Sequence, residues 1–100
     1  MIKFEWDEKK NVLNFNKHDV WFEETETVFY DPFEKTEEDY SDPNEERFRI
    51  TGMSVHNKPL VVTFTIRNDA IRIISARPPL PHEWRKYEQR PKQKRRKAHS

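Results

Sequence analysis

The stretch from Leu60 to Arg77, LVVTFTIRNDAIRIISAR, constrains the fold of this chain more than any other. It consists of two runs rich in β-branched and aromatic residues, 60–67 and 70–77, with Asn68-Asp69 between them. Asparagine and aspartate tolerate the positive φ that a two-residue hairpin loop requires, so the stretch predicts a β-hairpin. A loop of two residues also fixes the register of the two strands.

The predicted register gives this hairpin two unlike faces. The facing pairs are Arg67 with Ala70, Ile66 with Ile71, Thr65 with Arg72, Phe64 with Ile73, and Val62 with Ser75. One face is then apolar and must be covered by other parts of the chain. The other face carries threonines and arginines, which favour contact with water or with an anion: Thr63, Thr65, Arg67 and Arg72.

The last residue of the hairpin, Arg77, falls on the apolar face if the side chains alternate strictly. It reaches the arginine-bearing face only if the strand contains a bulge or ends before it. Otherwise we expect it to pair with an acidic residue of the helices. The residues alone leave both interpretations open.

A third strand, Arg47 to Val55, is predicted from the alternation of polar and apolar residues, with a three-residue turn at 56–58. If Val55 pairs with Pro59, Phe48 lies opposite Ile66, Ile50 opposite Phe64, Arg47 opposite Arg67, and Arg49 opposite Thr65. Arg47, Arg49, Arg67 and Arg72 then gather on one face. Like charges on facing strands cost a few tenths of a kcal/mol per pair, so an acidic part of the chain or an anionic ligand should offset them.

The other segments complete an α+β fold. A short strand around Phe4 is expected at the sheet edge, followed by a helix from Asp7 to about His18 and a second from Phe22 to Phe29. The acidic segment 31–46 is predicted to be a loop with room for one short edge strand, Phe33 to Thr36. A short helix begins near Pro81. We therefore expect two N-terminal helices packed on an antiparallel sheet of about four strands.

Charge is distributed unevenly along the chain. Residues 1–46 contain 5 Lys/Arg and 15 Asp/Glu, a net charge of −10, whereas residues 47–100 contain 14 and 3, a net charge of +11. Such asymmetry favours a polyanionic partner for the second half, or neutralisation of one half by the other within the fold. Residues 1–90 are expected to form one domain and the basic segment 91–100 a disordered tail.

Composition excludes several classes of site. The absence of cysteine excludes disulfides and thiol chemistry, and four scattered histidines do not have the spacing of a metal site. We expect no metal and no cofactor. The sequence has neither an apolar run long enough to span a membrane nor a signal-peptide pattern, which predicts a cytoplasmic protein with no membrane contact.

Motifs spread over residues 2–88 resemble the BrnT family, the toxins of bacterial type II toxin–antitoxin systems. The matching residues are Phe4, Trp6, Asp7, Lys10, Asn14, the pair Lys17-His18, Phe22, Val28-Phe29, Glu46-Arg47, Gly52, Arg67, the run Arg72 to Arg77 (RIISAR), Glu83 and Tyr87. The resemblance implies a RelE-like fold and metal-independent endoribonuclease activity on RNA that inhibits translation, with mRNA, either free or on the ribosome, as the substrate. It also implies neutralisation by a ribbon-helix-helix antitoxin, BrnA, with DNA contacted only through the toxin–antitoxin complex.

Metal-free RNA cleavage requires a base for the 2′-hydroxyl, positive charge around the phosphorane and an acid for the leaving oxygen. Arginine suits the middle role, because its planar fork matches phosphate oxygens and stays charged. We assign the scissile phosphate to Arg67 and Arg72 with Arg47 beside them, RNA binding also to Arg49, and a part in the site to Arg77 if it reaches this face. The candidates for proton transfer are Lys17, His18, Glu83 and Tyr87.

Each assignment has a simpler alternative. The arginines can be the solvated face of a half-buried sheet, His18 can cap a helix, and Tyr87 can belong to the core. The basic tail can follow RNA, contact the ribosome or only aid solubility. At the level of function, the alternatives are a non-catalytic nucleic-acid-binding module with the same arginine face, and a protein that only binds other proteins.

Overall fold

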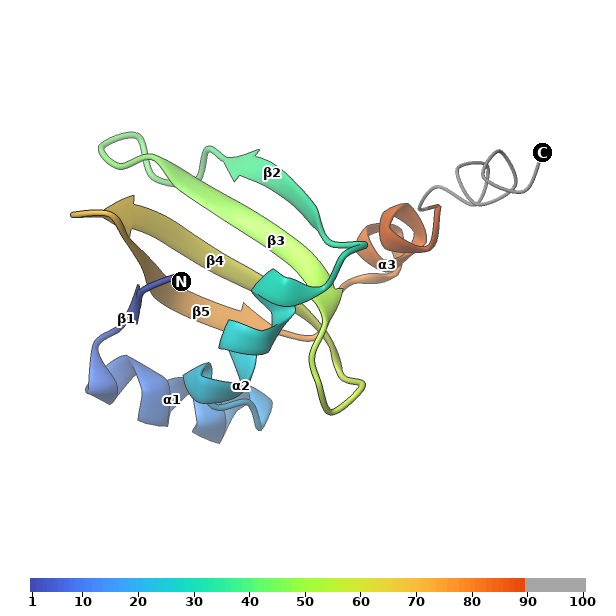
Figure 1. Cartoon of the computed structure of the whole chain (residues 1–100), viewed down its shortest axis with the longest axis horizontal. Coiled ribbons are helices and arrows are strands. Elements are labelled where there is room, and N and C mark those ends of the chain that lie inside the picture. The colour runs from blue at the N-terminus through green and yellow to red at the C-terminus, as the bar shows by residue number, and fades with distance from the viewer. Residues whose placement is uncertain (90–100) are drawn as a thin grey trace.

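A five-stranded sheet forms the centre of the molecule (Figure 1). The computed structural model describes residues 1–89, so the predicted disordered tail, residues 91–100, lies outside the described residues. The strands are β1 (Phe4–Glu5), β2 (Lys35–Asp39), β3 (Arg47–Met53), β4 (Pro59–Arg67) and β5 (Ala70–Arg77), in the order β1-β5-β4-β3-β2. β1 runs parallel to β5, so the sheet is mixed and not purely antiparallel as predicted, and it has five strands instead of about four.

The helices are α1 (Glu8–His18), α2 (Phe22–Thr25), the 3-10 helix η1 (Glu26–Tyr30) and α3 (Pro81–Glu88). The α+β class is therefore confirmed. The predicted helix 22–29 is split, because the hydroxyls of Thr25 and Thr27 donate to carbonyl oxygens three residues earlier and compete with α-helical bonding. Asp7 caps α1 as expected by accepting from the Lys9 amide.

The register of the β4–β5 hairpin matches the prediction from the turn as far as Phe64 opposite Ile73. Beyond that pair the prediction is wrong: Thr63, not Val62, lies opposite Ser75, because Ile74 is an extra residue in β5. This bulge reverses the alternation of the side chains that follow it. Ala76 is therefore fully buried in the core, and Arg77 lies opposite Val61.

The register of β3 and β4 also differs from the prediction. Phe48 lies opposite Phe64 and Arg49 opposite Thr63, a shift of two residues, with the turn at 55–57 instead of 56–58. The last residue of a three-residue hairpin turn adopts the left-handed conformation, and Asn57 has this conformation. The turn is therefore at 55–57, with Asn57 as its last residue. A shift of two keeps every side chain on its predicted face. Arg47, however, does not lie opposite Arg67.

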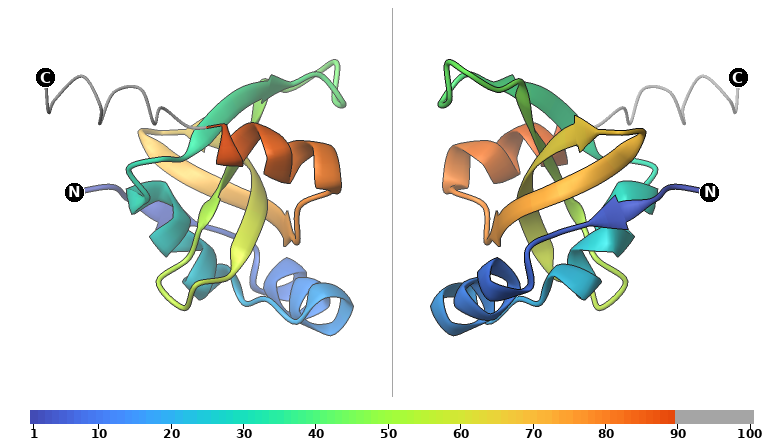
Figure 2. Two further views of the ribbon diagram at one scale, coloured as in Figure 1. Left: turned by 90° about the vertical axis from the view of Figure 1, so that its right-hand side faces the viewer. Right: turned by 90° about the vertical axis from the view of Figure 1, so that its left-hand side faces the viewer.

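The core lies between one face of the sheet and the N-terminal helices. Residues of β3, β4 and β5 contact residues from the α1–α2 connection, α2 and η1: Val20, Phe22, Val28, Ile50, Leu60, Val62, Phe64, Ile73 and Ala76. Figure 2 shows η1 and α3 on opposite sides of the sheet, so α3 covers part of the face that carries the arginines. Within residues 1–89, no helix has the length and apolar character needed to cross a membrane.

Candidate nucleic-acid interface

The face of the sheet opposite the core, called the polar face below, carries most of the predicted site residues. Its cross-strand rows are Glu37–Arg49–Thr63–Ser75, Lys35–Thr51–Val61–Arg77, and Thr65–Arg72. The bulge at Ile74 brings Arg77 to this face, together with Arg72 and Arg49. The open question about Arg77 is therefore resolved in favour of the arginine-bearing face.

Arg77 is also paired with a helix residue, as the other interpretation expected. Its two terminal nitrogens donate to the Glu83 carboxylate over 2.8 and 2.9 Å, and one of them also donates to the Pro78 carbonyl. These hydrogen bonds between Arg77 and Glu83 lower the pKa of Glu83 to about 2, and the same bonds raise the pKa of Arg77. Glu83 is thus ionised and held at the start of α3.

Acidic residues of the first half of the chain neutralise three more arginines of this face, Arg47, Arg49 and Arg72. Arg72 contacts Glu5 over 3.1 Å, and Arg49 lies 4.0 Å from Asp39. Arg47 contacts Glu45 over 2.8 Å and Asp42 over 3.4 Å. The opposite charges of the two halves therefore meet within the fold, which is one of the two outcomes expected from the charge pattern.

Two pKa shifts follow from these contacts. The hydrogen bond to Glu45 is the main cause that raises the pKa of Arg47. Burial by itself would raise the pKa of Asp39, but hydrogen bonds from Ser41 and the charges of Arg49 and Arg47 outweigh burial and lower it. These arginines therefore remain charged, and the nearby Asp39 remains ionised.

Arg67 differs from the other arginines. It is exposed at the tip of the hairpin, and no ion pair within residues 1–89 involves it. The predicted contact with Arg47 fails because of the two-residue register shift. The Thr65 hydroxyl instead donates to the Glu46 carbonyl, which ties this end of β4 to the chain entering β3.

Lys17 and His18 lie at the end of α1, beside the outer edge of β5. β1 pairs only with Ile71 and Arg72, and α1 covers the edge beyond them, where the Asn14 side chain accepts from the Ala76 amide. Lys17 and His18 line a pocket of about 190 Å³ with Ile74 and Ser75. His18 also lines a pocket of about 250 Å³ that reaches Pro78. Both residues thus border the polar face at the bulge.

Tyr87 is buried in the core, as one interpretation of the sequence expected, and it also makes a contact that the sequence did not suggest. It is 3% exposed, and its hydroxyl donates to the Asp31 carboxylate over 2.6 Å. The same carboxylate accepts from the backbone amides of Met53 and Phe33. Asp31 therefore joins η1, the end of β3 and α3. In the sequence, Asp31 is only the first residue of the acidic segment predicted to be a loop, and nothing local marks this distant partnership.

α3 lies across the polar face between two strands that are not neighbours. Glu83 contacts Arg77 of β5, and Lys86 contacts Glu37 of β2 over 3.5 Å. Its Trp84 and Tyr87 rings are stacked, with centroids 4.8 Å apart. The helix leaves the part of the face near the hairpin tip uncovered. Within residues 1–89 no group of three or more histidine and acidic side chains could hold a metal ion.

Comparisons with known proteins identify the family. Residues 6–83 match the family model described as the ribonuclease toxin, BrnT, of type II toxin-antitoxin systems. No curated protein matches the sequence. The fold is similar to that of the Brucella abortus ribonuclease toxin, BrnT, known from a 1.1 Å crystal structure, with a TM-score of 0.64 and 24% identity over 80% of this chain and 99% of that chain. With the family model matching most of its length, the chain belongs to the BrnT family of ribonuclease toxins of type II toxin–antitoxin systems.

Proposed function

We propose that this protein is a metal-independent endoribonuclease that cleaves RNA, inhibits translation in the cytoplasm and is neutralised by a ribbon-helix-helix antitoxin of the BrnA type. Membership in the family supports the reaction class, RNA as substrate and an antitoxin as partner. We propose residues 1–90 as the single RelE-like toxin domain, with residues 91–100 as a basic tail.

The gathering of Arg49, Arg72 and Arg77 on the polar face is the observation that carries the proposal. In our proposal Arg72 holds the scissile phosphate, Arg47 and Arg49 contact neighbouring phosphates, and Arg67 draws the RNA backbone to the hairpin tip. Guanidinium groups supply the positive charge that the phosphorane needs. The ion pair of Arg72 with Glu5 is partly exposed, so it is weak enough for a phosphate to replace the carboxylate.

Proton transfer is assigned to Lys17 and His18. They border the polar face at Ile74 and Ser75, and no ion pair within residues 1–89 involves either side chain. Histidine changes its charge near neutral pH, which suits a general base or acid. We propose that Glu83 and Tyr87 act as positioning residues, because Glu83 holds Arg77 and Tyr87 holds α3 through Asp31.

The decisive test is cleavage of a labelled transcript by the purified protein in excess EDTA. We expect products from the wild type, and a loss of about tenfold or more from Arg67→Ala and Arg72→Gln with their melting unchanged. Arg85→Gln, which removes an exposed arginine of α3, serves as the matched control and should cleave normally. Full activity in both polar-face variants would overturn the site assignment.

The same assay separates the alternative functions. An intact transcript that is nevertheless bound, with affinity that falls as salt rises, would identify a non-catalytic nucleic-acid-binding module. Neither binding nor cleavage would identify a protein that only binds other proteins. For the partner, co-expression with the product of a short neighbouring reading frame of ribbon-helix-helix type should restore growth and translation. The complex, but not the toxin alone, should bind promoter DNA.

A further inference from the structure

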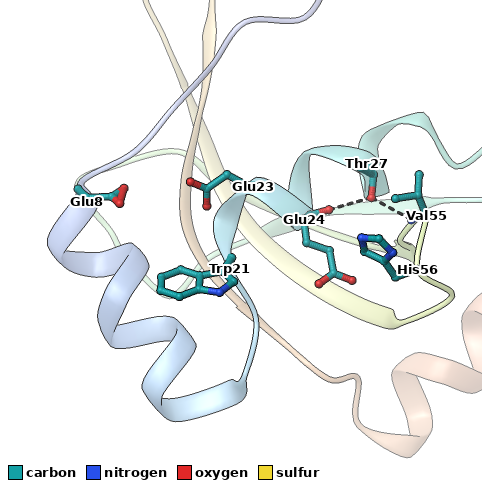
Figure 3. Close-up of a pocket in the computed structure, with 7 residues that line it drawn as sticks. All are labelled: Glu8, Trp21, Glu23, Glu24, Thr27, Val55 and His56. Atoms are coloured by element: carbon teal, nitrogen blue, oxygen red, sulfur yellow. Dashed lines mark hydrogen bonds between the residues drawn. The ribbon is translucent and has the colours of Figure 1, made fainter.

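An acidic pocket of about 560 Å³ lies between the N-terminal helices and the β3–β4 turn (Figure 3). It is called the acidic pocket below. Its lining consists of three carboxylates, one indole, one threonine of η1 and two residues of the β3–β4 turn: Glu8, Trp21, Glu23, Glu24, Thr27, Val55 and His56. These residues come from α1, α2, η1 and the connections beside them, on the side of the sheet that faces away from α3. The pocket is therefore separate from the polar face.

The carboxylates of the acidic pocket are held mainly by neutral donors. Glu8 accepts from the Trp6 indole and the Asn11 amide, and Glu23 accepts from Asn11 over 3.0 Å. Glu24 accepts from the Ser54 hydroxyl over 2.7 Å, and within residues 1–89 its one ion pair is with Lys58 at 3.8 Å. Neutral donors fix the positions of the oxygens but do not cancel their charge, so the pocket stays anionic.

The Trp21 indole adds an aromatic surface to this negative charge. Phe15 stacks on it at 4.1 Å with an interplanar angle of 11°, yet Trp21 is still 41% exposed. Figure 3 shows the carboxylates of Glu8, Glu23 and Glu24 around the indole. An aromatic ring beside carboxylates attracts the ammonium of lysine or the guanidinium of arginine. The same charges repel RNA, so a cationic protein segment is the fitting occupant.

The chain itself supplies such a segment. Residues 90–100, RPKQKRRKAHS, contain six Lys/Arg and no acidic residue, and one residue, Gln89, separates them from the end of α3. Eleven residues span at most about 36–40 Å when extended. This length exceeds the two shorter dimensions of the molecule, which are 28 and 27 Å.

We propose that the acidic pocket is the docking site for the basic segment 90–100 of the same molecule. One lysine or arginine side chain lies against Trp21, and its neighbours meet Glu8, Glu23 and Glu24. The docked segment is then withheld from RNA, because the pocket and RNA compete for the same cations. The inference concerns binding within the chain and does not depend on RNA cleavage.

The test compares three variants of the full-length chain by NMR of the tryptophan indole N–H groups. In the tail variant, Lys94, Arg95, Arg96 and Lys97 are each replaced by glutamine. In the pocket variant, Glu23→Gln and Glu24→Gln keep a carbonyl oxygen for Asn11 and Ser54. The control variant, Glu37→Gln with Glu38→Gln, makes the same change of charge on β2. Carbodiimide cross-linking of tail lysines to carboxylates, read by mass spectrometry, supplies the second measurement.

We expect the tail variant to shift the Trp21 resonance and, because the Trp6 indole donates to Glu8, also that of Trp6, and to leave that of Trp84 unchanged. Cross-links should join Lys92, Lys94 or Lys97 to Glu8, Glu23 or Glu24. Cross-links to Glu8, whose carboxylate the pocket variant keeps, should become much weaker in that variant. All of these cross-links should be lost at high ionic strength and kept in the control variant. An unmoved Trp21 resonance, or cross-links confined to acidic residues 37–46, would overturn the proposal. Cross-links that disappear on dilution would assign the pocket to the tail of a second copy instead.

Discussion

The Arg77 guanidinium and the Glu83 carboxylate form a two-point ion pair that fastens the start of α3 to the end of β5. Glu83 also accepts from the Leu80 amide, so one carboxylate both caps the helix and holds the arginine. The Pro78-Pro79 pair separates the two partners, and the ion pair closes the turn that these prolines begin. The position of α3 on the polar face depends on this contact.

The ion pair predicts an acid-sensitive contribution to stability. Arg77 lowers the pKa of Glu83 from 4.5 to about 2, so the stabilisation is fully present above about pH 4.5 and is lost as the pH falls towards 2. Glu83→Gln should reduce the free energy of unfolding by about 1–3 kcal/mol near neutral pH, and by much less near pH 2. Denaturant titrations over this pH range measure the difference. Glu88→Gln is the control, and a wild-type–variant difference that does not depend on pH would contradict the assignment.

The bulge at Ile74 predicts a large effect of deleting one residue. Removing Ile74 restores strict alternation, which turns Arg77 towards the core and Ala76 away from it. An unpaired charge directed into an apolar layer lowers the free energy of unfolding by about 3–5 kcal/mol. The deletion variant should therefore unfold at a much lower denaturant concentration than the wild type, or not fold at all. The control Ile74→Val keeps the bulge and should cost no more than about 1.5 kcal/mol. Equal unfolding midpoints for the deletion and the wild type would refute this account of Arg77.

The contact between Tyr87 and Asp31 separates a positioning role from a chemical one. Tyr87→Phe removes a hydrogen bond to a charged group and should cost about 1.5–3 kcal/mol of stability. Cleavage per folded molecule should be retained. Tyr40→Phe, at a tyrosine that is 81% exposed, is the control for the substitution itself. Lost cleavage with unchanged stability would return Tyr87 to the proton-transfer candidates.

Gly52, the only glycine of the chain, predicts a steric effect. A Cβ atom added there would lie 3.0 Å from Val28 Cγ1 and 3.2 Å from Asp31 Oδ2. Gly52→Ala should therefore cost about 1–3 kcal/mol by overpacking. Combining it with Val28→Ala removes the nearer contact, so the double variant should be more stable than the sum of the two single effects. Simple additivity in this cycle would show that crowding by Val28 is not the cause.

Local sequence signals predicted the elements of this fold but not all of their pairings. The Asn68-Asp69 turn fixed the first four pairs of the β4–β5 hairpin, because a two-residue loop allows few registers. The sequence did not decide whether the β3–β4 turn lies at 55–57 or at 56–58. The rule that apolar residues face apolar residues did not decide between these two positions either. Phe48 finds an apolar partner in either register, since Phe64 and Ile66 lie on the same face.

For the candidate site, the sequence predicted the positions of the arginines but not the residues that they contact. The arginine-bearing face follows from alternation, so Arg49 and Arg72 were placed correctly. Their acidic partners were not found, because Glu5 and Asp39 are distant in the sequence and any of the fifteen acidic residues of the first half could have paired with them. Asp31 was missed for the same reason, since its partners Met53 and Tyr87 come from two other elements.

The sequence by itself determined β1, β3, β4 and β5, the hairpin turn, the face on which most of the arginines lie, and the resemblance to the BrnT family. Each of these follows from residues that are neighbours along the chain or recur with a fixed period. The edge strand predicted at Phe33 to Thr36 was misplaced, because β2 is Lys35–Asp39. Only the tertiary structure decided the face of Arg77 and the partner of Tyr87. A bulge is selected by burial of Ala76 and by the Asn14 side chain that binds its amide, and both depend on α1 packing beside β5. The alternation of polar and apolar residues along β5 therefore cannot predict the bulge, because the contact between Asn14 and Ala76 joins residues far apart in the sequence.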